Sequence, residues 1–144
     1  SKYYTENPVY PLENTVANLN IDMIGRVDDW HTHSNYVYLI GSDRLSLDLH
    51  EISEETNKKY VGLELDYTYN DIDDPNRYYY RSDHYNFAKN NIPVIFYFNG
   101  VHEDYHKPSD TIDKIDLEKT RRITKLIFLT AWEIANRDKR PALY

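Results

Sequence analysis

The chain has 144 residues, the size of one domain, and a net charge of −7 with its acidic residues spread along the sequence. That charge argues against nucleic-acid binding, which needs a clustered basic footprint, and no apolar run approaches the ~20 residues of a membrane-spanning helix. Because there is no cysteine, disulfides and thiolate metal sites are excluded, and any metal would have nitrogen and oxygen ligands.

The first half of the chain alternates between strand and helix patterns. Apolar and polar residues alternate over 15–24, which predicts a strand with unlike faces. A polar loop at 26–35 leads to a second expected strand at 35–40, and a third is expected at 61–67. Between them the spacing predicts a helix over 44–59. One face of this helix collects Leu45, Leu49, Ile52 and Thr56.

The second half continues the same alternation. A helix is expected over 84–90, capped by Ser82 and ended before Pro93. The unbroken apolar run at 93–98 predicts a strand buried on both faces. A final helix is expected to follow Asp116 as its cap. Its buried face is predicted to hold Ile123, Leu126, Ile127, Thr130, Ala131 and Ile134. This alternation favours a single α/β unit.

The segment DYHKPSDTIDKID at 104–116 carries the first candidate site. It places His106 four residues before Asp110, just after a buried strand. A neutral imidazole binds zinc through one nitrogen and usually donates its other N–H to a carboxylate, so Asp110 is a candidate partner. Tyr105 could present its phenol to a developing oxyanion. The alternative is a polar turn that caps the next helix.

A second candidate lies far upstream, in NIDMIGR at 20–26. Asp22 comes at the carboxyl end of the first expected strand, where open α/β sheets place their ligands. The alternative is that Asp22 only caps the following turn.

Three segments in this order, 20–26, YYRSDHYNFAKNNIPVIFYFNG at 79–100 and 104–116, resemble the zinc aminopeptidases of metallopeptidase family 28. The resemblance is nearest to bacterial exopeptidases with leucyl aminopeptidase-like activity, and it covers residues 1–144. It implies one three-layer α/β/α unit with a mixed central sheet, of the phosphorylase/hydrolase-like fold.

The resemblance also implies a site with two zinc ions. In the family, a His, a bridging Asp, a Glu, an Asp and a His hold the two ions. The last two match Asp22 and His106, which would serve different ions. Tyr105 matches a tyrosine that polarises the substrate carbonyl. Asp83 and His84 match an Asp-His pair beside the active site, although Asp83 could instead support the amino terminus of its helix.

Several of the family's metal ligands and its general base have no match in this chain, which affects the expected activity. The family's first His, its bridging Asp and its Glu pair, which includes the general base, lie upstream of Asp22, and residues 1–20 contain no His and no Glu-Glu. Glu54 and Glu55 come later in the chain and are expected on a solvated helix face. The chain therefore resembles the carboxyl-terminal half of an aminopeptidase. We expect it to be inactive alone, and to bind zinc weakly or not at all.

The resemblance implies peptide substrates with a free amino terminus and a secreted or periplasmic parent protein. Two other functions stay open. One is a glutaminyl cyclase, which shares the fold but uses a single zinc. The other is a metal-free binding or dimerisation module of the same fold. A half-sheet would also leave an exposed edge strand, through which the chain could form a homodimer.

The remaining histidines and basic residues carry no expected function. His31 and His33 lie among polar residues and are expected to be exposed in a loop. No partner can be named from the sequence for His50 or His102. The final helix is expected to place its basic cluster on the solvent face: Lys119, Arg121, Arg122 and Lys125.

Overall fold

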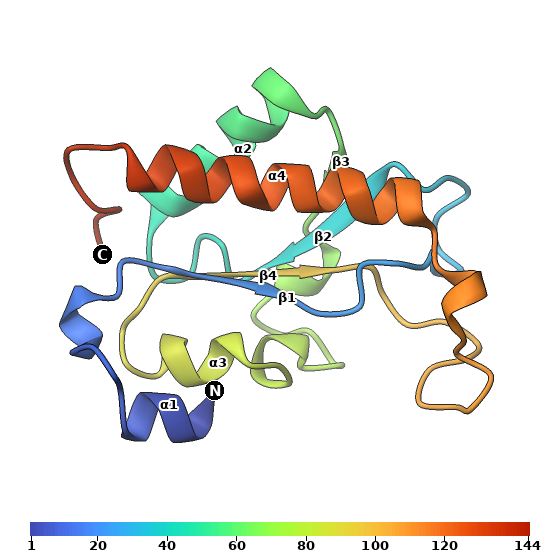
Figure 1. Cartoon of the computed structure of the whole chain (residues 1–144), viewed down its shortest axis with the longest axis horizontal. Helices are drawn as coiled ribbons and strands as arrows, with labels where there is room; N and C mark the ends of the chain where they lie inside the picture. Colours follow the sequence, from blue (N-terminus) through green and yellow to red (C-terminus); the bar gives the residue numbers. More distant parts are fainter.

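A four-stranded mixed sheet organises the computed structural model, which describes all of residues 1–144 (Figure 1). The strands are β1 (Asn18–Ile21), β2 (Tyr36–Ile40), β3 (Glu64–Asp66) and β4 (Val94–Phe98). Their order is β1-β4-β2-β3. The pairs β1 with β4 and β2 with β3 are parallel, whereas β2 runs antiparallel to β4. The expected mixed central sheet is confirmed.

Helices cover both faces of this sheet. They are α1 (Lys2–Glu6), α2 (Leu47–Tyr60), α3 (His84–Ala88) and α4 (Leu117–Ala135). Single turns of 3₁₀ helix lie at Leu12–Asn14, Thr68–Asn70, Tyr78–Tyr80 and Ile112–Lys114. The long helices α2 and α4 pack together on one face, and α3 packs against β4 and β1 on the other. The three-layer α/β/α arrangement is therefore confirmed. None of the helices is long and apolar enough to cross a membrane.

Every residue of β2 and β4 is buried, because alternate side chains enter two cores. The core under α2 and α4 contains Val37, Leu39, Leu49, Ile95, Tyr97 and Ile123. The core under α3 contains Tyr36, Tyr38, Tyr78, Tyr79, Phe96 and Phe98. The apolar run at 93–98 thus behaves as predicted.

The two edge strands are shorter than predicted, since each has a pairing partner on one side only. β1 has four residues, which run from Asn18 opposite Val94 to Ile21 opposite Tyr97. β3 has three residues, all paired with β2.

Of the two expected caps, Asp116 is confirmed and Ser82 is not. Asp116 accepts a hydrogen bond from the Lys119 backbone N–H at 2.9 Å and begins α4. Ser46, for which no cap was predicted, caps α2 in the same way, and α2 starts at Leu47, three residues later than expected. The prediction that Ser82 caps α3 is wrong. Its hydroxyl donates instead to Asp22 at 2.8 Å, because the end of β1 presents a charged acceptor beside it.

The basic cluster of α4 does not form a solvent face. Lys119 is 1% exposed, and its ammonium donates to the carbonyls of Ser34 and Tyr36 and lies 3.3 Å from the Tyr36 ring centre. Arg122 and Lys125 reach backbone carbonyls at the end of α2. Arg121 and Lys125 are exposed, as expected, and Arg122 is half-buried.

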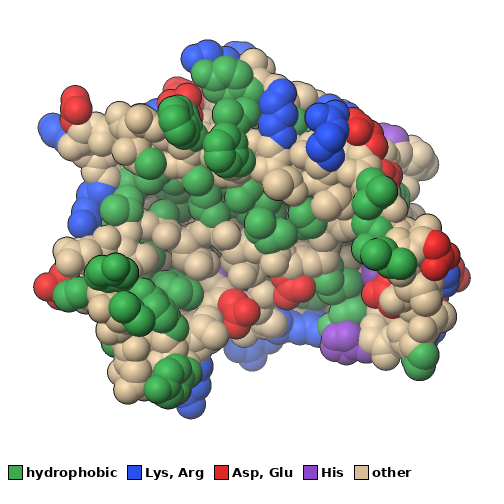
Figure 2. Space-filling model, viewed as in Figure 1, with side chains coloured by type: hydrophobic (Ala, Val, Ile, Leu, Met, Phe, Trp, Pro, Cys, Tyr) green, Lys and Arg blue, Asp and Glu red, His purple; other side chains and the backbone are tan.

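The open edge of β1 borders an apolar groove of about 510 Å³ beneath α4. The groove is lined mainly by Val16, Ala17, Leu19, Ala131, Ile134 and Ala135. Figure 2 shows the hydrophobic side chains gathered between α4 and β1 on this face. Ala131, predicted to be buried under α4, is exposed here.

Candidate active site

The two segments that carry the candidate zinc ligands emerge side by side. β1 and β4 are parallel neighbours, so their carboxyl ends meet at the same edge of the sheet. Asp22 directly follows β1, and residues 99–111 follow β4. The Asp22 N–H donates to the Tyr97 carbonyl at 3.3 Å, and the Asn99 N–H donates to the Met23 carbonyl at 3.0 Å. The ladder thus continues past both strands and brings the two segments together.

Arg26 joins these two segments further out. One guanidinium N–H group donates to Asp104 at 2.6 Å and another to Asp110 at 2.8 Å. Lys114 also donates to Asp104, at 2.8 Å. The hydrogen bonds from Lys114, Ser109 and Arg26 lower the pKa of Asp104 far below its ordinary value. The turn between Asp104 and Asp110, which contains the candidate residues, is therefore held at both ends by one guanidinium.

A buried carboxylate supports the base of the same loop. Asp28 accepts hydrogen bonds from the Tyr38 hydroxyl at 2.6 Å and lies 2.8 Å from the His31 imidazole. The Tyr36 hydroxyl, held by the Asp28 N–H, donates to the Asn99 carbonyl at 2.7 Å. Burial acts to raise the pKa of Asp28, but the hydrogen bonds from Tyr38 and His31 outweigh it and the pKa is lowered. The start of the 99–111 loop is thus tied to the sheet.

Asp22 and His106 both keep atoms at this edge that are free to bind a metal ion. Asp22 is exposed, and of its two carboxylate oxygens only one accepts a hydrogen bond, from Ser82. His106 is exposed and has the left-handed backbone φ of 56°. Its ring stacks on Tyr105, with 3.9 Å between ring centres, and makes no hydrogen bond.

Asp110 lies in this loop but does not contact the His106 ring. One of its carboxylate oxygens accepts from Arg26, and the other lies 3.8 Å from the His102 imidazole. The structure therefore gives Asp110 a structural partner in place of the imidazole that the sequence suggested. Because Arg26 is the stronger donor and is already anchored on Asp104, it attracts this carboxylate away from His106.

The Asp-His pair at 83–84 lies behind Ser82. Asp83 is exposed at the start of α3, where it makes no capping bond and accepts from the Ser1 hydroxyl. His84 is completely buried and stacks on Phe96. Burial lowers the pKa of His84 to about 4, so the imidazole is neutral at pH 7. Both of its ring nitrogens lack a hydrogen-bond partner.

The other histidines have partners that the sequence did not reveal. The prediction that His31 is exposed is wrong, because its side chain is 8% exposed and stacks on Tyr36. His33 is half-exposed, as expected, beside Glu64. His50 contacts Ser42. Glu54 and Glu55 are exposed on α2, as expected.

The chain does not complete a metal centre by itself. No group of three or more His, Cys, Asp or Glu side chains lies close enough together to hold an ion. A catalytic zinc typically has three protein ligands and an open position for water. Asp22 and His106 offer the correct atoms, an exposed carboxylate and an exposed imidazole, but only two of them.

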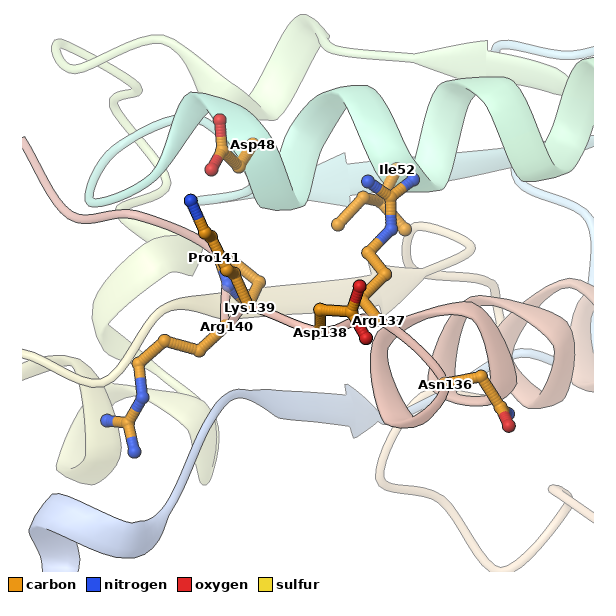
Figure 3. Close-up of a pocket in the computed structure, with 8 residues that line it drawn as sticks. All are labelled: Asp48, Ile52, Asn136, Arg137, Asp138, Lys139, Arg140 and Pro141. Atoms are coloured by element: carbon orange, nitrogen blue, oxygen red, sulfur yellow. The ribbon is translucent and has the colours of Figure 1, made fainter.

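Two hollows of the surface have similar volumes, and only one of them lies at this site. One of about 530 Å³ lies against it and is lined in part by Met23, Arg26, His102 and Asp110. Another, of about 450 Å³, lies between α2 and the carboxyl-terminal segment (Figure 3). In that second hollow, Asp48 accepts from the Ala142 N–H, which anchors the segment. It contains none of the candidate site residues.

Three residues of the site were not anticipated. Arg26 and Asp104 lie at the ends of the two segments singled out in the sequence, and their opposite charges were the available signal. Asp28 gave no such signal, because it lies in a loop rich in polar residues. Its partners become visible only once β2 is placed.

Comparison with known proteins agrees with this architecture. A model of peptidase family M28 matches residues 1–131. Comparison with curated proteins gives no significant match. Among solved structures, the LapA aminopeptidase of Legionella pneumophila is similar with a TM-score of 0.69 and 21% identity, over 96% of this chain and 34% of that one.

Two other solved structures give the same result. An aminopeptidase from Aneurinibacillus sp. strain AM-1 has a TM-score of 0.67 and 19% identity, over 98% of this chain and 30% of that one. BSAP, a zinc aminopeptidase from Bacillus subtilis, has a TM-score of 0.66 and 21% identity, over 92% of this chain and 31% of that one. The chain thus spans about a third of the length of these structures, which establish its fold.

Proposed function

The chain belongs to peptidase family M28, and from this premise we propose that it forms part of a zinc-dependent aminopeptidase that releases amino-terminal residues from peptides. The observation that carries the proposal is the pairing of two segments at one sheet edge, with Asp22 on one and His106 on the other. Both side chains keep an oxygen or nitrogen atom without a hydrogen-bond partner. Residues from the same two segments line a hollow of about 530 Å³.

Asp22 and His106 are proposed to bind two different zinc ions, each residue as one ligand of one ion. When bound, such ions would lower the pKa of a water molecule toward ~7 and so would supply hydroxide at neutral pH. The Ser82 hydroxyl orients the Asp22 carboxylate through its hydrogen bond, which leaves the second oxygen for the metal. Arg26 fixes the turn that presents His106.

Tyr105 is proposed to act on the substrate. Its phenol has no hydrogen-bond partner within the chain, so the O–H is available to a substrate carbonyl oxygen that becomes negative in the transition state. The stacking of its ring on the His106 imidazole keeps the phenol beside the proposed metal ligand. Asp83 and His84 are proposed to support the site from behind Ser82. The buried His84 imidazole is neutral at pH 7.

The isolated chain is proposed to be inactive. It supplies two of the ligands, and residues 1–20 lack the consecutive Glu pair that includes the family's general base. The uncovered edge of β1 and the adjoining apolar groove would accept further strands of the same catalytic domain. In their absence, a second copy of the chain is the proposed partner. A secreted or periplasmic location of the parent enzyme is part of the same proposal.

A hybrid enzyme tests this function. In the hybrid, this chain replaces the matching third of the Bacillus subtilis zinc aminopeptidase. We expect hydrolysis of leucine p-nitroanilide that is lost with a chelator and restored with zinc. Asp22→Ala or His106→Ala should lower kcat/KM by about a thousandfold or more, as expected for loss of a metal ligand.

The matched control is Glu54→Gln, which removes an exposed acid of α2 and should leave the rate unchanged. A folded, zinc-loaded hybrid without activity would contradict the proposal, as would full activity in the His106→Ala variant. Circular dichroism and metal analysis of each variant separate these results from misfolding.

A further inference from the structure

An aromatic pocket of about 400 Å³ opens beside the candidate site and has no assigned role. Its walls include Trp30 and three tyrosines, Tyr38, Tyr69 and Tyr78. The ring centre of Tyr69 lies 4.5 Å from that of Tyr38 and 4.8 Å from that of Tyr78, so the three tyrosines form one continuous wall. Trp30 is 82% exposed, which is unusual for so large an apolar side chain. These rings would bind a cation through their faces.

The pocket also contains a carboxylate with spare hydrogen-bonding capacity. Asp66 accepts from the Thr68 N–H at 2.8 Å with one oxygen, and the other lies 3.2 Å from the His31 ring. Two oxygens provide about four acceptor positions, so at least one remains for a ligand. Because the Asp66 side chain is only about one-fifth exposed, a cation that reaches it would be partly shielded from water.

The remaining charges around the pocket are mostly negative. Asp28 lies beneath Tyr38, and the buried Asp74 accepts from the Tyr78 N–H at 3.1 Å. Burial raises the pKa of Tyr69, and the negative charges of Asp28 and Asp74 raise it further. Two groups oppose this charge: the His31 ring between Asp28 and Asp66, and Arg81, whose guanidinium lies 5.0 Å from the centre of the Tyr78 ring.

The pocket is next to the proposed metal ligands along the chain and at the same sheet edge. β2 runs antiparallel to β4, so the start of β2, with Tyr38, lies at the carboxyl end of β4. Val101 lines the pocket and belongs to the loop that carries His106. Tyr78 lines it from the other side, on the segment that continues to Ser82, the hydrogen-bond partner of Asp22.

We infer that this pocket binds a cationic side chain, and that it directs the enzyme toward peptides whose first residue is arginine or lysine. The aromatic walls hold the methylene stem and face the cation, and Asp66 accepts a hydrogen bond from the guanidinium or ammonium group. The assignment to the first residue rests on the proposed function. The preference for a cation rests on the pocket alone.

The direct test uses probes that mimic the side chain only, n-butylguanidinium and its neutral analogue n-butylurea. Binding to the 144-residue chain is followed by NMR through the indole N–H signals of its two tryptophans. Trp30 lines the pocket, and Trp132 lies on α4 and serves as an internal control. We expect n-butylguanidinium to move the Trp30 signal alone and to bind about tenfold more tightly than n-butylurea.

Two variants test the residues. Asp66→Asn should weaken n-butylguanidinium binding about fivefold or more and leave n-butylurea unaffected. Trp30→Leu changes a side chain too exposed to be needed for folding, and should weaken binding of both probes; because this variant lacks the Trp30 indole signal, its binding is measured by calorimetry. The matched control is Asp73→Asn, which removes an exposed acid outside the pocket. Equal binding of the two probes, no movement of Trp30, or unchanged binding in Asp66→Asn would overturn the inference.

This test does not depend on zinc or on catalysis. Cation binding in the pocket together with an inactive hybrid would refute the proposed function and leave the pocket assignment intact. An active hybrid that cleaves arginine and leucine p-nitroanilides at a ratio unchanged by Asp66→Asn would refute the substrate preference and leave the peptidase function intact.

Discussion

Arg26 and Asp104, which are 78 residues apart, form a salt bridge with 2.6 Å between nitrogen and oxygen. The pair is shielded from solvent, with 17% and 6% of the two side chains exposed. A second bond from the same guanidinium to Asp110 closes the turn that carries Tyr105 and His106. The proposed ligand on the loop after β4 is thus held in place by a residue from the segment after β1.

Replacement of Arg26 by methionine should free this turn. Methionine keeps the apolar stem but leaves Asp104 with Lys114 as its only cationic partner. We expect the backbone amides of 104–110 to exchange with solvent about tenfold faster, because the turn then opens locally. Hydrogen-exchange NMR measures this. In the control, Arg121→Met, which removes an exposed Arg–Glu118 pair, exchange in the turn should be unchanged. Equal exchange in both variants would contradict the assigned role.

Lys119 should make the stability of the chain depend on pH. Burial lowers the pKa of its ammonium from 10.5 to about 8, against the attraction of Asp116 and Asp28. The unfolded chain therefore binds more protons than the folded chain between these values, and the free energy of unfolding rises with pH there. The increase from pH 8 to 9.5 is expected to be about 2 kcal/mol.

Lys119→Met should abolish this rise, and Lys58→Met, which changes an exposed lysine, should retain it. Urea unfolding at several pH values measures the effect. At higher pH the trend reverses, because burial raises the pKa of Tyr97 to about 12 and the folded chain then holds the additional proton. A flat profile between pH 8 and 9.5 in the unmodified chain would contradict the account of Lys119.

Asn57 should contribute strongly to stability. Its side chain donates to the Leu63 carbonyl at 2.7 Å and accepts from the Leu63 N–H at 2.9 Å, which closes the turn from α2 to β3. Asn57→Ala leaves both buried backbone groups unpaired and should cost about 2 kcal/mol. Denaturant unfolding measures the loss, with Asn90→Ala, an exposed asparagine, as control. A cost no larger than that of the control would mean that water replaces the side chain.

The uncovered edge of β1 should cause the isolated chain to associate. We expect sedimentation to show dimers, and Ile21→Lys to give monomers, because a charge on an edge strand opposes pairing. Ile21 is 48% exposed, so this change should not unfold the chain. Val9→Lys alters an exposed apolar residue outside the sheet and should leave dimers intact. A monomeric unmodified chain would show that the edge is protected in another way.

Local patterns predicted the elements whose determinants lie within a few residues. Asp116 caps α4 because its partner is three residues away, and the run at 93–98 is buried on both faces as its composition required. The burial of Lys119 and His31 had no local signal. The Lys119 ammonium donates to carbonyls more than 80 residues away, and His31 lies against a tyrosine on the following strand.

The same distinction applies to the site. The segments around Asp22 and His106 were recognised from short motifs, and the parallel pairing of β1 with β4 brings them to one edge. The sequence paired Asp110 with His106, four residues away, because nothing local indicates that Arg26 lies near it in the fold. The fold selected Arg26.

Zinc titration of the 144-residue chain, with Asp22→Ala and His106→Ala as variants, tests the central claim most directly. Cobalt can replace zinc in parallel, since its paramagnetism reports by NMR which residues lie near the ion. The account predicts that zinc binds weakly, without one tightly held ion per chain. The NMR signals that cobalt perturbs should lie near Asp22 and His106. Asp22→Ala should abolish the perturbation near residue 22, and His106→Ala should abolish the perturbation near residue 106. Tight stoichiometric zinc that disappears with His106→Ala would contradict it, because the chain would then complete a metal site by itself.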